Sequence, residues 1–345
     1  MVIAEKNSLE KKLKMGFKAT VLHKEGDKFS RGIHNLDFNE LKHGNVLVKV
    51  DYSSLNYKDG MILKNGGSLV KDYPHVPGID FSGTVIESSS DNFKKDDKVI
   101  LTGWRVGEIY YGGYSQYAKV NSDFLVKSPN NISSKEAMSI GTAGFTALLS
   151  SFAVQARETI LLGEKVKDVV VTGATGGVGS IAVMVLSKMG YNVTAVTGKK
   201  DKENYLKKLG AKSIVNRLEF EGETRPLDKG IWDGVVDTVG GKILSKILSQ
   251  TKPNGIVAAC GLTNSLKLET TVMPFIIRGV KLWGINSVET SIKRREFVWS
   301  QVRSLIDMNL LNEITETWNM EKLIHSYENI LKGQISGRIV VDVNQ

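Results

Sequence analysis

A short glycine-rich segment in the middle of the chain has the residue types and spacing to hold phosphate groups. Residues 169–171 are a β-forming run of valines, and the sequence TGATGGVG follows at 172–179, before a helical pattern over 180–189. Glycine lets backbone N–H groups approach a phosphate closely, and the N-terminus of the following helix favours negative charge. A glycine triplet alone is weak evidence, but this one lies between a strand and a helix. We therefore predict a pyrophosphate site of a dinucleotide here. The predicted contacts are Thr175, Gly176, Gly177 and Val178.

The residues that follow the next predicted strand indicate which dinucleotide is bound. Residues 192–197 form a β-type run, and Thr197, Gly198, Lys199 and Lys200 stand at its end. An NAD site usually has an Asp or Glu there, which would repel a 2′-phosphate. A hydroxyl and cations suit that phosphate instead, so we predict NADP(H), with Thr197, Gly198 and Lys199 as contacts. In the alternative interpretation, Lys199 and Lys200 are solvated residues that open the next helix.

Length and composition are typical of a soluble globular protein. The 345 residues suffice for two domains, and 41% of them are hydrophobic and 24% charged. No run approaches the roughly 18 consecutive apolar residues of a membrane helix. Residues 1–14 lack the apolar region of a secretory signal and are expected to form an N-terminal extension. The single cysteine, Cys260, fits a reducing cytoplasm and excludes an intrachain disulfide.

The formal net charge of +9 has three interpretations. A basic protein can bind nucleic acid, but these lysines are scattered, with no long basic run and no interleaved aromatics. We therefore predict no nucleic-acid partner. The other two are a lysine-rich composition and a polyanionic substrate such as a coenzyme A thioester, and composition does not decide between them.

The chain divides into segments of different pattern. Residues 141–285 alternate between strand and helix, which predicts a doubly wound parallel sheet. Residues 15–140 show short alternating strands separated by turns, with one long strand expected over 115–126, and predict a β-rich, partly open barrel. Residues 286–345 contain two helical stretches and a final strand, and are expected to return to the first domain.

This order of domains resembles the medium-chain dehydrogenase/reductase superfamily, from about residue 16 to the C-terminus. Within it, five local strings are similar to the NADPH-dependent acryloyl-CoA reductase group, whose members are often labelled quinone oxidoreductases. The strings are SSLNYKD at 53–59, PGIDFSGTV at 77–85, LTGW at 101–104, IGTAGFTA at 140–147 and TVMPFI at 271–276.

The resemblance implies a fold, a reaction and an assembly. The fold is a GroES-like barrel domain, 15–140 with 286–345, into which a Rossmann domain, 141–285, is inserted. The reaction is the NADPH-dependent reduction of acryloyl-CoA to propanoyl-CoA, and the assembly is a homodimer. Zinc-dependent relatives place a His-Glu pair after the Pro-Gly turn, whereas Ile79 and Asp80 stand there in this chain, so we predict no metal.

Tyr57 is the candidate residue closest to the chemistry, because the resemblance places its loop over the nicotinamide. Tyr57 is therefore predicted as a cofactor contact. In such a reduction, hydride adds to the β-carbon and negative charge develops on the thioester oxygen, so the phenol could donate a hydrogen bond to the cofactor or to the enolate. In the alternative interpretation Tyr57 is a packing residue and solvent protonates the enolate. Asn56 and Asp59 are expected to orient this loop as turn residues.

The remaining predicted cofactor contacts lie where strands end. Ligands of a doubly wound sheet bind at the carboxyl ends of its strands. The resemblance implies that Leu262 and Ser287 meet the nicotinamide amide, with Ile276 nearby. Arg217 follows a short strand and is predicted beside the adenosine, although a surface arginine is an equally weighted alternative.

Two other functions stay open at this point. An NADPH quinone reductase would use the same cofactor with a flat apolar acceptor in place of a thioester. A relative of this fold that binds nucleic acid or serves structurally would bind NADPH without turnover, and its nucleic-acid binding would weaken with salt.

Overall fold

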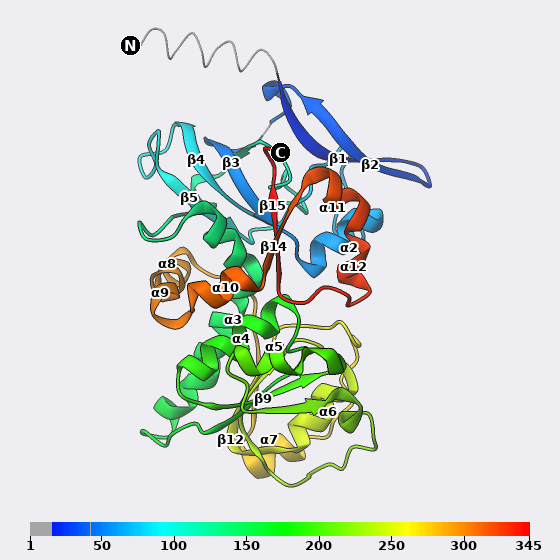
Figure 1. The fold of residues 1–345 in the computed structure, drawn as a ribbon, viewed down its shortest axis with the longest axis vertical. Coiled ribbons are helices and arrows are strands. Elements are labelled where there is room, and N and C mark those ends of the chain that lie inside the picture. Colours follow the sequence, from blue (N-terminus) through cyan, green and yellow to red (C-terminus); the bar gives the residue numbers. More distant parts are fainter. Residues whose placement is uncertain (1–15, 42) are drawn as a thin grey trace. The chain divides into compact units, whose positions relative to one another are not determined.

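The computed structural model describes residues 16–41 and 43–345, so the expected N-terminal extension, residues 1–14, lies outside the described residues. The chain forms two compact units (Figure 1). The first comprises the described residues up to 142 together with 288–299 and 315–345, and the second comprises 143–287 and 300–314. The grouping of 300–314 with the second unit differs from the sequence-based layout, which assigned all of 286–345 to the first domain.

The second unit is built on a six-stranded sheet in which every neighbouring pair is parallel. Across the sheet the strands are β10 (Ser213–Asn216), β9 (Asn192–Thr197), β8 (Asp168–Val171), β11 (Trp232–Asp237), β12 (Thr251–Ala259) and β13 (Lys281–Gly284). Successive strands run outward from β8 in one direction and from β11 in the other. The order therefore reverses between β8 and β11, and the predicted doubly wound sheet is confirmed.

The helices of this unit follow the strands that the sequence pattern predicted. They are α4 (Gly177–Lys188), α5 (Glu203–Lys208), α6 (Gly241–Ser249) and α7 (Met273–Arg278), with α9 (Val302–Leu305) and α10 (Met308–Glu313) from the later segment. Helix α9 packs against α4, which explains why 300–314 group with this unit. Valines of the central strands, such as Val170, Val235 and Val257, form the core with Ile247 and Leu248 of α6.

The first unit contains a seven-stranded, largely antiparallel sheet and a separate hairpin. The hairpin pairs β1 (Phe17–Glu25) with β2 (Lys28–Leu36). The sheet follows the order β14 (Thr315–Asn319), β15 (Arg338–Asp342), β3 (Val46–Ser54), β4 (Asp80–Ser88), β5 (Lys98–Thr102) and β7 (Leu125–Lys127), with β6 (Tyr117–Val120) paired to β3. The GroES-like fold is thus confirmed. The single strand expected over 115–126 was wrong, because the 3₁₀ turn Ser122–Phe124 separates β6 from β7.

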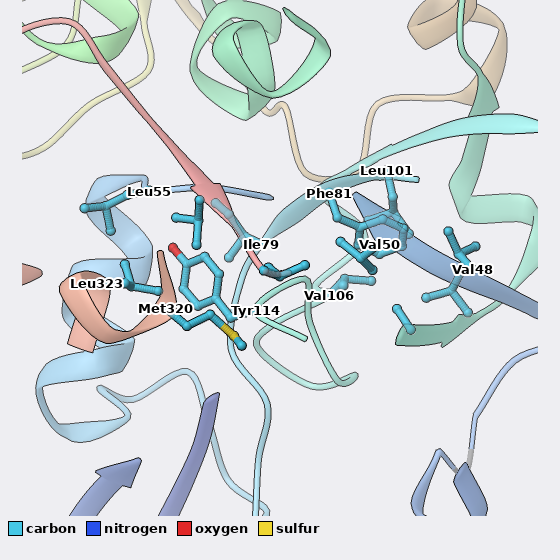
Figure 2. Close-up of a cluster of buried hydrophobic side chains, with 14 of the residues drawn as sticks. Val48, Val50, Leu55, Ile79, Phe81, Leu101, Val106, Tyr114, Met320 and Leu323 are labelled. Carbon is cyan, nitrogen blue, oxygen red and sulfur yellow. The ribbon is translucent and has the colours of Figure 1, made fainter. Parts of the chain in front are cut away.

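The helices of the first unit lie mainly in its late segments, and the core lies under its sheet. The helices are α2 (Tyr57–Asn65), α8 (Ile292–Ser300), α11 (Met320–Ser326) and α12 (Glu328–Leu331). Figure 2 shows Val50, Phe81 and Leu101 of the sheet in the same apolar cluster as Met320 and Leu323 of α11. The buried Tyr114 ring lies within this cluster, and its hydroxyl donates to the Ser54 carbonyl (3.0 Å).

The longest helix, α3 (Ser134–Ile160), is kinked at its eighth residue, Gly141, and its residues divide between the two units. Gly141 leaves the helical conformation at φ 52° and ψ −158°. A Cβ there would lie 2.7 Å from Ser54 Oγ and 2.8 Å from Arg338 Nη2, so only glycine fits. Among the described residues this is the one helix long and apolar enough to cross a membrane, but 89% of its most apolar window is buried, as in a core helix of a soluble protein.

Candidate functional site

The predicted phosphate-binding turn joins β8 to α4 in the second unit. Residues 172–176 form the turn, and Gly176 is the N-cap of α4, so no side chain caps the first turn of this helix. Gly173 has φ +56°, and a Cβ on Gly179 would lie 2.2 Å from the Gly173 carbonyl oxygen. The backbone therefore folds back tightly on itself, and the N–H groups at the start of α4 are available to an anion.

The predicted contacts at this turn take the positions that the sequence pattern assigned to them. Gly177 and Val178 are the first residues of α4, and both are half-buried. The side chain of Thr175 is buried, so its expected contribution comes from the backbone. The roles of these residues stay predictions.

A cavity of about 570 Å³ opens where the sequence predicted the 2′-phosphate contacts. Its lining is Gly198, Lys199, Lys200, Asp201, Asn216, Arg217 and Leu218. Thr197 ends β9, and its Oγ1 accepts a hydrogen bond from the backbone N–H of Lys199 (3.1 Å). The acidic residue of this lining, Asp201, pairs with Lys202 at 3.4 Å.

The shape of this cavity depends on Gly198. A Cβ at that position would lie 2.8 Å from Nε and 2.9 Å from Cδ of Arg217, so the arginine side chain crosses directly over the glycine. Arg217 is exposed, but it faces the same cavity as Lys199. The two cations come from the ends of neighbouring strands, β9 and β10, so two positive charges line the same cavity.

Lys199 differs from its neighbour in burial. Lys200 is exposed, whereas Lys199 is half-buried, and burial followed by repulsion from Lys202 lowers the pKa of its ammonium group. A cation held in this environment gains more from a bound anion than a fully solvated lysine does. This favours the phosphate-binding interpretation over that of two solvated residues.

Two other predicted cofactor contacts of this unit lie beyond the carboxyl ends of β12 and β13. Leu262 follows β12 with 52% of its surface exposed, and Ser287 follows β13 and is half-buried. Their positions agree with a ligand at this edge of the sheet. Ile276 lies on α7, the helix that precedes β13, and is 74% exposed. The contacts of all three residues to a cofactor stay predictions.

Tyr57 belongs to the first unit, where it is the first residue of α2 and is half-buried. The turn before it is held by Asp59, whose carboxylate accepts from the backbone N–H of Asn56 (3.0 Å) and from its side-chain amide (3.1 Å). The next residue, Lys58, forms a 2.8 Å ion pair with the buried Glu108. Tyr57 is therefore presented by a backbone segment that is fixed on both sides.

A buried carboxylate, Asp80, fastens this segment to the sheet. It accepts from the backbone N–H (3.0 Å) and hydroxyl (2.9 Å) of Ser54, the amide of Asn56 (3.0 Å) and the N–H of Thr142 (2.8 Å). The buried Arg338 donates to the Ser54 hydroxyl (2.9 Å). This arrangement is a charge-compensated network, the form in which buried ions are tolerated.

Sequence reasoning did not find this network, nor the buried Asp237 at the end of β11. Two arginines of the described chain, Arg278 and Arg295, make structural contacts. The guanidinium of Arg278 donates to the carbonyls of Ser249 (2.8 Å) and Thr251 (3.0 Å). Arg295 is 1% exposed and donates to Thr102 Oγ1 (2.8 Å), and burial lowers its pKa to about 10.

Among the described residues, no group of three or more His, Cys, Asp or Glu is placed to hold a metal ion. The one cysteine, Cys260, is partly buried, and burial raises the pKa of its thiol to about 12. Its sulfur lies 3.4 Å from the Asp237 carbonyl oxygen. A thiol in this state is neither a nucleophile nor a good metal ligand at neutral pH.

Comparison with known proteins gives matches over both units. The family model described as alcohol dehydrogenase GroES-like domain matches residues 42–130, and that described as zinc-binding dehydrogenase matches residues 177–304. The chain is 46% identical over 331 residues to the acrylyl-CoA reductase AcuI of Ruegeria pomeroyi, covering 95% of this chain and 99% of that protein.

Two solved structures are similar over nearly the whole chain. The structure of Escherichia coli K-12 YhdH with bound NADPH has a TM-score of 0.90 and 42% identity, covering 94% of this chain and all 100% of the other. The structure of Bacillus subtilis YhfP, a putative quinone oxidoreductase, has NAD bound, a TM-score of 0.89 and 41% identity, covering 94% and 99%.

Stability should depend on pH through Asp59. Burial, and then repulsion by Asp80, raise the pKa of Asp59 to about 7, well above its value in an unfolded chain. Between about pH 4 and pH 7 the folded state then holds a proton that the unfolded state has released. The free energy of unfolding should therefore fall across this range as pH rises, by an amount on the order of a few kcal/mol.

Urea unfolding of wild type and Asp59→Asn between pH 4 and pH 8 measures this contribution. The amide cannot ionise, so the stability difference, wild type minus variant, should decrease from pH 4 to pH 7 and then level off. A difference that stays constant, or that grows with pH, would contradict the raised pKa.

Proposed function

Because the chain belongs to the medium-chain dehydrogenase/reductase superfamily, in the group of acryloyl-CoA reductases and related quinone oxidoreductases, we propose that it is an NADPH-dependent acryloyl-CoA reductase. The 46% identity to the Ruegeria pomeroyi enzyme over 95% of the chain carries this proposal. The activity itself is the reduction of the C=C bond of acryloyl-CoA to give propanoyl-CoA.

The residues of the second unit fit the proposed cofactor. The N–H groups at the start of α4 would bind the pyrophosphate, and Lys199 and Arg217, with Thr197, would bind the 2′-phosphate. The cavity lined by the two cations supports the phosphorylated coenzyme, because the 2′-phosphate of NADPH carries a negative charge that NADH lacks. This matters because the two similar solved structures contain different coenzymes, NADPH in one and NAD in the other.

The chemistry divides between cofactor and protein. When bound, NADPH would supply a hydride to the β-carbon of the acryloyl group, and solvent would supply the proton that the α-carbon takes up. On the protein side, we propose that the Tyr57 hydroxyl donates a hydrogen bond to the thioester oxygen, where negative charge develops. The carboxylates of Asp59 and Asp80 hold the turn that precedes α2, so Tyr57 is presented without reorganisation during the reaction.

Zinc independence and a cytoplasmic location are further parts of the proposal. Ile79 follows the Pro-Gly turn and has no ligand atom, and Asp80 is fully occupied by the donors of its network. Cys260 is the single cysteine of the sequence and forms no intrachain disulfide, which supports a reducing compartment. One equivalent of zinc per chain, retained after purification, would contradict the first part.

We also propose that the enzyme is a homodimer that pairs through β13. In the described part of the chain this strand is the edge of the six-stranded sheet, and the side chains of Leu282 and Trp283 are 36% and 39% exposed. The nearby α7 exposes Ile276 and Ile277 by 74% and 63%. An apolar, unpaired edge is protected when it pairs with its own copy. A monomeric mass in solution would contradict this assembly.

Three acceptors distinguish the proposed function from its alternative, an NADPH quinone reductase. The similarity to the putative quinone oxidoreductase of Bacillus subtilis favours this second function. NADPH oxidation should be measured with acryloyl-CoA, crotonyl-CoA and a benzoquinone, each supplied separately. We expect the highest kcat/KM with acryloyl-CoA. Turnover with the quinone only would replace the proposed function by the alternative.

Coenzyme choice should depend on Lys199. Lys199→Glu combined with Thr197→Val should weaken NADPH binding strongly, because loss of one charged contact costs about 1.5–3 kcal/mol, while NADH binding should change little. The dissociation constants of both coenzymes measure this. Lys207→Glu, on the exposed face of α5, makes the same charge change outside the cavity and serves as the control. Equal losses for NADPH and NADH would remove the assignment.

Tyr57→Phe tests the role of the phenol. If its hydroxyl stabilises the thioester oxygen, kcat with acryloyl-CoA should fall about tenfold or more while the protein keeps its stability. Tyr52→Phe is a suitable control, because Tyr52 is a half-buried tyrosine of β3 in the same unit. Unchanged turnover in Tyr57→Phe would make Tyr57 a packing residue.

A further inference from the structure

A fully buried carboxylate, Asp237, lies at the carboxyl end of β11 and is used by no part of the proposed chemistry. It accepts a hydrogen bond from the hydroxyl of Thr172 (2.8 Å) and another from the backbone N–H of Gly240 (2.8 Å). Thr172 follows β8 and is the first residue of the glycine turn. Asp237 therefore connects the loops that leave β8 and β11, the two neighbouring strands between which the strand order reverses.

Reciprocal hydrogen bonds reinforce this connection. The backbone N–H of Thr238 donates to Thr172 Oγ1 (2.9 Å), and the hydroxyl of Thr238 donates to the Thr172 carbonyl (2.8 Å). We call Thr172, Asp237 and Thr238 the threonine clasp. A Cβ on Gly173 would lie 2.3 Å from Thr238 Oγ1, so the threonine clasp packs against the first glycine of the turn and leaves no room for a side chain there.

The clasp also reaches the loop that follows β12. The backbone N–H of Cys260 donates to the Asp237 carbonyl (2.9 Å), and a Cβ on Gly261 would lie 1.8 Å from the Thr238 carbonyl oxygen. The loops after β8, β11 and β12 are thereby held together at the carboxyl edge of the sheet. All of these contacts lie within the second unit.

Burying a carboxylate costs free energy, so stability alone does not explain why Asp237 is at this position. Burial raises the pKa of Asp237, which reflects the free energy needed to keep its charge away from water. Apolar side chains of similar volume often replace buried polar groups with no loss of stability. The hydrogen bonds of Asp237, Thr172 and Thr238 are directional, so they fix the backbone of the glycine turn relative to the loop that follows β11.

We propose that Asp237 is a positioning residue for the cofactor: through the threonine clasp it fixes the glycine turn in the backbone shape that receives the pyrophosphate of NADPH. The inference rests on the proposed function, since it concerns the same cofactor. Asp237 acts through Thr172 and the turn, and Lys199 and Arg217 bind the 2′-phosphate independently of it.

The test compares two ligands on the full chain. NADPH needs the turn for its pyrophosphate, whereas adenosine 2′-monophosphate carries the 2′-phosphate and no pyrophosphate. We expect Thr172→Val and Asp237→Asn to weaken NADPH binding about tenfold, measured by calorimetry, and to leave binding of adenosine 2′-monophosphate unchanged. Thr172→Ser keeps the hydroxyl and should restore the affinity for NADPH.

Thr251→Val is the matched control for a purely structural role. Thr251 is also fully buried in this unit and donates one hydroxyl hydrogen bond, to the Ile247 carbonyl (2.8 Å), but it begins β12 at the opposite edge of the sheet. The Thr251→Val variant should have a lower melting temperature than the wild type and the same affinity for NADPH. If Asp237→Asn does not fold, the three threonine variants decide the question.

Two results would overturn the inference while the proposed function stands. In one, Thr172→Val binds NADPH as tightly as the wild type does. In the other, Thr172→Val loses affinity for both ligands equally, as a general loss of structure would cause. Failure of the wild type itself to bind NADPH would overturn the proposed function, and this inference with it.

Discussion

The negative charge of a phosphorylated dinucleotide must be compensated at one edge of a parallel sheet, and the second unit is organised around this constraint. Parallel strands bring the loops that follow them to the same edge, so backbone N–H groups at the start of α4 and cations after β9 and β10 lie at the edge where we propose that the coenzyme binds. Tight glycine contacts make this possible. Gly179 lets α4 approach the turn closely, and Gly198 lets Arg217 cross the backbone and share a cavity with Lys199.

Both units use the same device to hold a functional turn. In the first unit, Asp80 and Asp59 accept hydrogen bonds from the segment that presents Tyr57. In the second, Asp237 accepts from Thr172 at the start of the glycine turn and from Gly240 in the loop between β11 and α6. Each carboxylate is buried and fully hydrogen-bonded, and each fixes backbone rather than facing solvent. Preorganisation of this kind lowers the free energy that binding or reaction would otherwise spend on ordering a loop.

Local sequence signals predicted much of this arrangement. The valine run, the glycines and the helical pattern after them lie within about one βα unit, so the turn between β8 and α4 was predictable. The absence of an Asp or Glu directly after β9 predicted 2′-phosphate contacts at the position where the cavity is found. Local signals misled where one irregular turn interrupted a pattern, as between β6 and β7, and where α9 joined the second unit through packing against α4.

The buried networks could not be predicted, because their partners are distant in sequence. Arg338 donates to Ser54, which lies 284 positions earlier, and Asp237 bonds Thr172 across 65 positions. The same reason applies to Arg295. It follows two other basic residues on α8, a pattern typical of a solvated helix face, yet its guanidinium is buried and donates to Thr102. Only the folded chain reveals which cation faces a ligand and which one holds a loop.

A crystal structure of the protein with NADPH tests the central claim most directly. We predict that the 2′-phosphate lies within hydrogen-bond distance of Lys199 Nζ and the Arg217 guanidinium, with the pyrophosphate against the first turn of α4. A 2′-phosphate that points to solvent, or a coenzyme seated away from the glycine turn, would contradict the account.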